Sequence, residues 1–236
     1  MSSRLKSILF AAILCFVCSA ILTTASTGLQ RFQEQNMRID RHRNILMSVG
    51  LVKADQRYPA DAIESMYAEF IKPLWVDQNG QLIQAPQGDE NNLPLYIYKK
   101  ENQIEAYIVP INSRGLWGRI QGYLAIGNDG STISGFTVYK HSETPGLGGE
   151  IEKAWFQKNW VGKQIVDRDG EFVSVSIAKG AVQDVIPTQK QSNYVDGISG
   201  ATLTGKYLTA GLKDVLEDYE PVSIRFRKNL IAEPPG

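Results

Sequence analysis

The residues of this chain best suited to chemistry lie in two glycine-rich segments. The first runs Glu143-Thr-Pro-Gly-Leu-Gly-Gly-Glu150, and the second runs Asp196-Gly-Ile-Ser-Gly-Ala-Thr202. Each could be no more than a turn, because Pro-Gly and Asp-Gly are turn-forming pairs. The second segment, however, directly precedes a helical pattern, and a helix N-terminus attracts anions.

A phosphate could approach the backbone closely in this second segment. Gly200 and Ala201 carry almost no side-chain bulk, and the Thr202 hydroxyl stands just ahead of the expected helix. The phosphate could rest there or be esterified to that hydroxyl. The residues alone leave both open.

A serine hydrolase and a metalloprotein fit the sequence poorly. Gly197-Ile-Ser-Gly-Ala201 falls one residue short of a Gly-x-Ser-x-Gly nucleophile elbow, and no histidine follows Ser199 to serve as base. Cys15 and Cys18 lie in an apolar run, where cysteine behaves as a small hydrophobe. With only two distant histidines, we predict neither catalytic triad residues nor metal ligands.

The elements that must position these segments predict an α+β domain. Leu203–Tyr219 has a helical apolar face and ends before Pro221. Asn128-Asp-Gly130 is a strong hairpin signal between two apolar runs. The strands that we expect are Leu95–Lys99, Ile104–Val109, Gln121–Ile126, Thr132–Tyr139 and Phe172–Ala178.

The N-terminal region predicts a membrane anchor. A helix over about residues 8–28 would be long enough to span a bilayer and longer than the apolar core of a signal peptide, the competing interpretation. Arg4 and Lys6 precede it, but four arginines follow closely, so charge alone leaves its orientation open.

Three regions follow from this pattern: an anchor over 1–30, a helical linker region and polar loop over 31–93, and the main domain over 94–236. In and around the second region we expect helices at Leu29–Leu51 and Asp61–Ile71, then a polar loop at Asn79–Pro94.

The charge balance is neutral, with 25 basic and 25 acidic residues, which argues against a nucleic-acid partner. A Gly-x-Gly-x-x-Gly fingerprint after a strand is absent from the sequence, so we expect no NADH site.

The second segment matches the covalent-flavinylation motif of FMN-binding domains. With the first segment, the N-terminal anchor and Gly115-Leu-Trp117, the chain resembles the family of C subunits of the sodium-translocating NADH:quinone reductases. The G subunits of Rnf electron-transport complexes are the alternative, with the same flavin chemistry implied.

The resemblance implies FMN bound covalently by a phosphoester to Thr202, not to Thr204, after delivery by a flavin transferase. It implies an electron-carrying subunit that works with the other subunits of the reductase complex, held by membrane lipid as a single-pass protein of the bacterial inner membrane with its domain on the periplasmic side.

The resemblance also assigns roles around the cofactor. Ser199, Gly200 and Ala201 would shape the turn, and the backbone N–H groups of Leu203 and Thr204 would meet the phosphate. The ring would lie against Glu143, Thr144, Leu147 and Gly148. Three residues have open alternatives: Asp196 (transferase recognition or turn), Trp117 (ring contact or core) and Lys179 (charge near the ring or solvated surface).

Overall fold

The structure, a computed structural model, describes residues 2–85, 91–232 and 234. Two compact units make up the chain, Met1–Asp40 and Arg41–Gly236. The first helix, α1 (Ser3–Ser48), begins in the first unit, and its last turns belong to the second. The predicted helix over 8–28 and the predicted continuation from Leu29 are therefore one uninterrupted helix.

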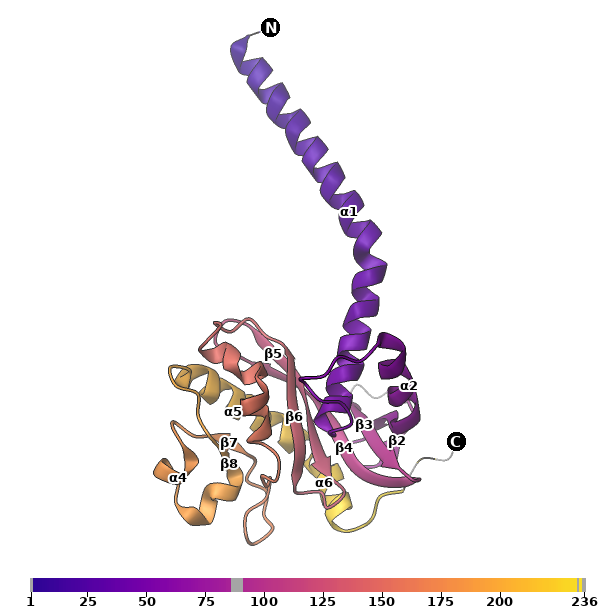
Figure 1. Ribbon diagram of the computed structural model, residues 1–236, viewed down its shortest axis with the longest axis vertical. Coiled ribbons are helices and arrows are strands. Elements are labelled where there is room, and N and C mark those ends of the chain that lie inside the picture. Colours follow the sequence, from indigo (N-terminus) through magenta and orange to yellow (C-terminus); the bar gives the residue numbers. More distant parts are fainter. Residues whose placement is uncertain (1, 86–90, 233, 235–236) are drawn as a thin grey trace. The chain divides into compact units, whose positions relative to one another are not determined.

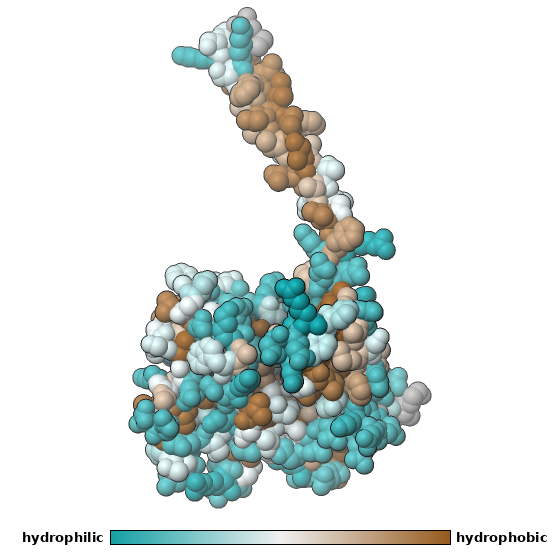
Figure 2. All heavy atoms as spheres, in the orientation of Figure 1, coloured by the Kyte–Doolittle hydropathy of each residue, from teal (hydrophilic) through white to brown (hydrophobic). Residues whose placement is uncertain are grey.

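The N-terminal part of α1 is long and apolar enough to cross a membrane. Figure 2 shows a band of hydrophobic side chains along this part, bounded by hydrophilic residues. Large apolar side chains there are exposed, including Phe10, Phe16 and Leu22. Such a surface requires an apolar environment, because a helix that is hydrophobic all round is otherwise found in a core.

Six antiparallel strands form the main sheet of the second unit (Figure 1). Their order is β2-β1-β3-β4-β5-β6, so each of β3, β4 and β5 pairs with the next strand in sequence. The strands are β1 (Ile71–Val76), β2 (Leu82–Ile83), β3 (Leu93–Lys100), β4 (Gln103–Arg114), β5 (Arg119–Gly127) and β6 (Ile133–Lys140). The predicted α+β class and the predicted hairpin at Asn128-Asp-Gly130 are confirmed.

The last two helices cover the sheet and complete the core. Helix α5 (Thr202–Asp218) packs against β4 and buries Leu208, Leu212 and Leu216 completely, as its apolar spacing predicts. Helix α6 (Glu220–Arg227) follows after one residue, and its Ser223 Oγ lies 2.7 Å from the Tyr107 hydroxyl of β4. The direction of α5 is thus set by burial along most of its length.

Helix α2 (Ala60–Phe70) packs against β1 and β3. The last turns of α1 are joined to β6, where the Thr137 hydroxyl donates to the Asn44 carbonyl at 3.2 Å. Asn44, Ile45, Leu46 and Ser48 are buried, which agrees with a helix end that docks on the domain.

The sheet starts earlier in the chain than we expected. The predicted helical linker over 31–93 contains β1 and β2, and the predicted polar loop Asn79–Pro94 contains β2 and the start of β3. Residues 86–90 of that loop lie outside the described residues. Strand β1 was not predicted because it contains Pro73, and proline is rare in strands. The structure tolerates this proline because β2 pairs only with Trp75 and Val76, so Pro73 has a strand neighbour on one side only.

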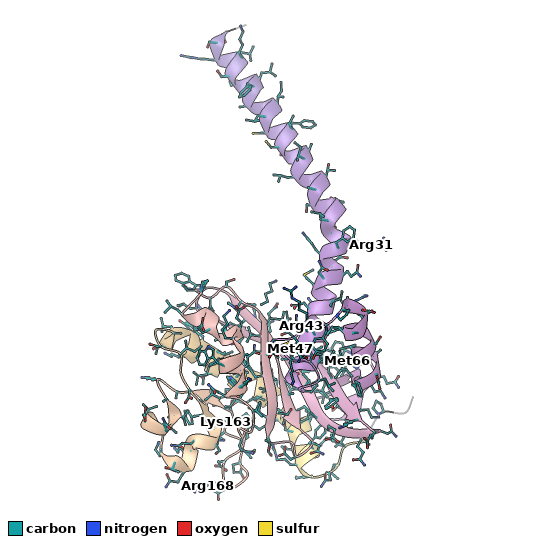
Figure 3. All side chains as sticks on the ribbon, viewed as in Figure 1. Arg31, Arg43, Met47, Met66, Lys163 and Arg168 are labelled. Carbon is teal, nitrogen blue, oxygen red and sulfur yellow. The ribbon has the colours of Figure 1, made fainter. Side chains whose placement is uncertain are left out.

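Short elements connect β6 to α5: η1 (Gly148–Glu152), α3 (Ala154–Lys158), β7 (Ser176–Ile177), α4 (Val182–Val185), η2 (Thr188–Asn193) and β8 (Tyr194–Val195). Strand β7 pairs with β8 in parallel. Lys163, labelled in Figure 3, joins this region by donating from Nζ to the Gln191 carbonyl at 3.0 Å.

The predicted strand Phe172–Ala178 is wrong in extent. Only Ser176 and Ile177 form β7, because Ser174 has a φ of +67° and the N–H groups of Val173 and Ser174 both donate to the Ile165 carbonyl. A residue in the left-handed region cannot continue an extended strand.

Candidate functional site

The second glycine-rich segment is a tight turn that leads into α5. The Ala201 N–H donates to the Ile198 carbonyl at 3.1 Å, and Gly200 has a φ of +73°. A positive φ at the third position is the signature of a type II turn, which explains the glycine. The turn delivers Thr202 to the first position of α5.

The first segment contains a turn of the same kind. The Leu147 N–H donates to the Thr144 carbonyl at 3.1 Å, and Gly146 has a φ of +74° after Pro145. The Gly149 N–H donates to the same carbonyl at 2.9 Å. Leu147 then leads into η1.

The two turns meet. A Cβ atom added to Gly200 would lie 2.8 Å from Leu147 Cδ2, so the Leu147 side chain lies against the backbone of the second turn. Leu147 is 43% exposed and Leu203, at the start of α5, is 49% exposed. The structure therefore brings both predicted segments to one place and leaves apolar side chains there in solvent.

Glu143 ties the segments together from inside the protein. Its side chain is buried; Oε1 accepts from the Trp117 N–H at 3.0 Å, and Oε2 accepts from the Thr204 hydroxyl. A Cβ at Gly148 would lie 2.8 Å from Glu143 Oε2, and one at Gly115 would lie 2.5 Å from Oε1. Both glycines thus make room for the carboxylate.

The two threonines at the start of α5 differ in exposure and in bonding. Thr204 is 2% exposed and its hydroxyl is occupied by Glu143, whereas Thr202 is exposed. Residues two apart on a helix point to nearly opposite sides, so the helix itself separates them. Only Thr202 of this pair presents its hydroxyl to an external group.

A cavity of about 300 Å³ opens beside Thr202. Its walls come from β7 and the residues after it, from the second turn, and from one face of α5. The lining residues are Ile177, Ala178, Lys179, Ile198, Ala201, Thr202, Gly205, Lys206 and Thr209.

Two lysines give this cavity positive charge. Lys179 was a candidate from the sequence, while Lys206 was missed. Residues four apart share one face of a helix, so the spacing of Thr202 and Lys206 was the available signal. The first N–H groups of α5 have no acceptor within the helix, and together with the lysines they give this place a positive character that favours an anion.

Asp196, which precedes the second turn, is bonded to the start of α4. Its Oδ1 accepts from the Val182 N–H at 2.7 Å and so holds the start of α4. Burial lowers the pKa of Lys163, while the negative charge of Asp196 acts in the opposite direction. A structural role for Asp196 is therefore present in the fold.

Trp117 is 69% exposed, so the interpretation as a core tryptophan is wrong. Its backbone N–H is held by Glu143, which places the Gly115–Gly118 loop at the first segment. Thr144 and Ser199 are exposed, Ala201 is buried and Gly148 is buried.

The alternatives find little support in the geometry. His141 bonds to the Glu143 backbone and to Glu152, and neither of these contacts involves Ser199 of the second turn. Over residues 2–85, 91–232 and 234, no group of three or more histidine, cysteine, aspartate or glutamate side chains could hold a metal ion.

Comparison with known proteins decides the family. The FMN-binding domain family matches residues 115–217, which include both turns, the cavity and nearly all of α5. The C subunit of the Na(+)-translocating NADH-quinone reductase of Yersinia pestis is 34% identical over 84% of this chain and 83% of its own length. The corresponding Pseudomonas aeruginosa protein is 32% identical over 86% of this chain and 88% of its own.

This chain belongs to the family of C subunits of the Na(+)-translocating NADH-quinone reductases. A crystal structure of the family member from Parabacteroides distasonis has a TM-score of 0.70 and 32% identity, covering 83% of this chain and 96% of that one. The resemblance noted from the sequence is confirmed, in preference to the Rnf alternative.

Proposed function

We propose that this member of the C-subunit family carries electrons through an FMN whose phosphate is esterified to Thr202 Oγ1. The exposed Thr202 hydroxyl at the start of α5, beside the cavity and two lysines, is the observation that carries the proposal. Bound FMN would supply a centre that accepts and donates electrons.

The residues present fit the phosphate end of such a group. The N–H groups of Thr202, Leu203 and Thr204 would hold its oxygens, and Lys179 and Lys206 would balance its charge. The small side chains of Gly200 and Ala201 leave the backbone accessible, as an ester at residue 202 requires.

The apolar side chains around the turns fit the flat ring. Leu147, Leu203 and Trp117 are 43%, 49% and 69% exposed, and a planar aromatic group would bury part of that area. Thr144 and Gly148 border the same place. Glu143 acts here through the loops that it holds, since both its carboxylate oxygens are used inside the protein.

An ester bond through the phosphate would keep the cofactor in its site at an effective concentration that free FMN does not reach. The open surroundings of Thr202 would leave the cofactor within reach of another protein, as an electron carrier needs. We propose that the other subunits of the reductase complex supply and remove the electrons, and that a flavin transferase makes the ester.

We further propose that α1 anchors the protein in lipid as a single span of the bacterial inner membrane, with the domain on the periplasmic side. The exposed apolar stretch of α1 supports the span. An alkaline phosphatase fused after the domain should be active, because this reporter folds only outside the cytoplasm. An inactive but stable fusion would show that the domain lies on the cytoplasmic side instead.

The covalent bond is tested by intact mass and in-gel fluorescence of the chain co-expressed with a flavin transferase. Wild type should gain one FMN less one water, Thr202→Ser should keep a fraction of it, and Thr202→Val should lose it. Thr188→Val, at an exposed threonine that begins η2 and does not line the cavity, serves as the matched control and should keep the flavin. An unmodified wild-type mass under these conditions would end the proposal.

A further inference from the structure

One histidine beside the first turn has a bonding pattern that the proposed flavin site does not account for. His141 follows β6 directly, and its Nδ1 accepts from the Glu143 N–H at 3.1 Å. Its Nε2 lies 3.1 Å from Glu152 Oε2, and the ring is 13% exposed. A Cβ at Gly149 would be 3.4 Å from the ring, so η1 packs against it.

The partners assign the tautomer of this ring. A backbone N–H can only donate, so Nδ1 must be unprotonated when it accepts from Glu143. In the neutral ring the proton then sits on Nε2, where it can be donated to the Glu152 carboxylate. The pKa of Glu152 is lowered, first by its hydrogen bond with Lys153, so this acceptor remains ionised.

A continuous series of hydrogen bonds follows. Glu152 orients the His141 ring, the ring holds the Glu143 main chain, and the Glu143 carboxylate holds the Trp117 N–H and the Thr204 hydroxyl. The series therefore joins η1 to the first glycine-rich segment, and this segment to the Gly115–Gly118 loop and to the N-terminal end of α5.

We propose that His141 is a positioning residue for this site, and that it holds the Glu143 segment in place only while its Nδ1 is unprotonated. A second ring proton would place an N–H at Nδ1 opposite the Glu143 N–H, and the hydrogen bond between them would be lost. The effect of His141 on FMN rests on the proposed function. Its hold on the Glu143 main chain does not.

Several charged side chains lie close to the ring in space or in the chain. Glu152 contacts the ring directly, and Lys153 lies behind it, with its Nζ at 2.8 Å from Glu152 Oε1. Glu150 of the same 3-10 helix is turned toward the Trp155 indole, and Lys140 precedes the histidine in the chain.

Hydrogen exchange at the Glu143 amide tests this in the full-length chain in detergent, with rates corrected for the intrinsic effect of pH. Wild type should exchange about tenfold faster at low pH, as expected for loss of one hydrogen bond. The amide oxygen of His141→Asn can replace Nδ1 as the acceptor and does not take up a proton in this pH range. In that variant the Glu143 amide should stay protected at both low and neutral pH. His141→Leu should exchange fast throughout.

His42→Asn is the matched control, since it removes the only other histidine, and it should keep the wild-type profile. Nitrogen-15 spectra of labelled histidine should show the proton of His141 on Nε2. A proton on Nδ1 in the neutral ring, a pH-independent Glu143 amide, or equal behaviour of the Asn and Leu variants would overturn the proposal, and the wild-type spectra decide it even if His141→Leu does not fold.

Flavin content links this residue to the cofactor. After co-expression with a transferase, His141→Leu should carry several-fold less FMN than His141→Asn, and equal content would remove the role toward the cofactor. One further outcome is a wild-type chain that never takes up FMN and yet shows pH-dependent exchange at the Glu143 amide. That result would refute the proposed function and leave the role of His141 in the fold standing.

Discussion

At the scale of single residues, the site separates hydroxyl groups by the faces of one helix. Thr202 and Thr204 have the same chemistry, yet the α-helical turn points one outward and the other at Glu143. Lys206 lies one turn beyond Thr202 on the cavity side. Under the proposed function, helical geometry and burial rather than residue type would decide which threonine carries the flavin.

Thr204→Val tests the structural half of this division. The change removes the hydrogen bond to Glu143 Oε2 and leaves a buried carboxylate oxygen without that donor, which costs about 1–3 kcal/mol. Chemical unfolding of the full chain in detergent should show the loss, while FMN remains attached. Thr202→Val is the same change at the exposed site and should alter stability by less than about 0.5 kcal/mol; similar losses from both would contradict the division.

Gly200→Ala tests the contact between the two turns. Alanine at φ +73° is strained by about 1 kcal/mol, and its Cβ would also lie 2.8 Å from Leu147 Cδ2. Gly146→Ala carries the same backbone strain, at φ +74° with nothing within 4 Å, so it is the matched control.

The Gly200→Ala chain should therefore melt at a slightly lower temperature than the Gly146→Ala chain; the difference is small because the Leu147 side chain is 43% exposed and can turn aside. In a Leu147→Ala background the two glycine changes should become equal, because the clashing methyl group is gone. A difference that persists in that background would mean that the turns meet in some other way.

At the scale of elements, the hairpin between β5 and β6 shows how a short signal sets strand order. Asp129 Oδ1 accepts from the Ser131 and Thr132 N–H groups at 2.9 and 2.8 Å, and Gly130 has a φ of +68°. The pairing of β5 with β6 then places His141 and the first turn at the end of β6. Local turn chemistry thus determines where the first segment begins.

Asp129 makes the stability of this hairpin depend on pH. Burial raises the pKa of Asp129, but hydrogen bonds from Thr132 and Ser131 and the charge of Arg227 outweigh it and lower the pKa below the usual value. A lowered folded-state pKa contributes stability above the unfolded-state pKa, near 3.9 for aspartate, and that stability is lost as pH falls through the folded pKa.

The melting temperature of wild type should accordingly fall on acidification below about pH 4, and Asp129→Asn should be less stable than wild type at pH 6. The gap between the two should narrow at low pH. A gap of constant size from pH 6 to pH 3 would show that the charge of Asp129 adds nothing.

At the scale of the whole molecule, the chain consists of two units with different solvent requirements. Residues Arg41–Gly236 have their own apolar core, built from the sheet, α5, α6 and the segment that connects β6 to α5. The first unit consists of the N-terminal part of α1, whose large apolar side chains are exposed. Membrane attachment and cofactor binding are therefore properties of separate parts of the chain.

Deletion of residues 2–28 should release the protein from membranes without unfolding the domain, since the core lies entirely beyond residue 41. Expressed without the other subunits, the shortened chain should appear in the soluble fraction with near-normal near-ultraviolet circular dichroism. The full chain should resist carbonate extraction in parallel. Retention of the shortened chain in membranes would show that the domain itself binds lipid.

The sequence by itself determined the parts of this protein that depend on neighbouring residues. The apolar stretch of α1, the Asn128-Asp-Gly130 hairpin, the face of α5 and the two glycine-rich turns all follow from spacing and turn chemistry, which act over a few residues. The family followed from the same motifs.

Tertiary structure decided what depends on residues far apart in the chain. Pro73 concealed β1, Ser174 shortened the strand at β7, and neither could be seen without their partners. Only folding showed Glu143 buried between Trp117 and Thr204, Trp117 itself exposed, and Lys206 beside Lys179. Burial and long-range hydrogen bonds belong to the packed chain, so local pattern does not contain them.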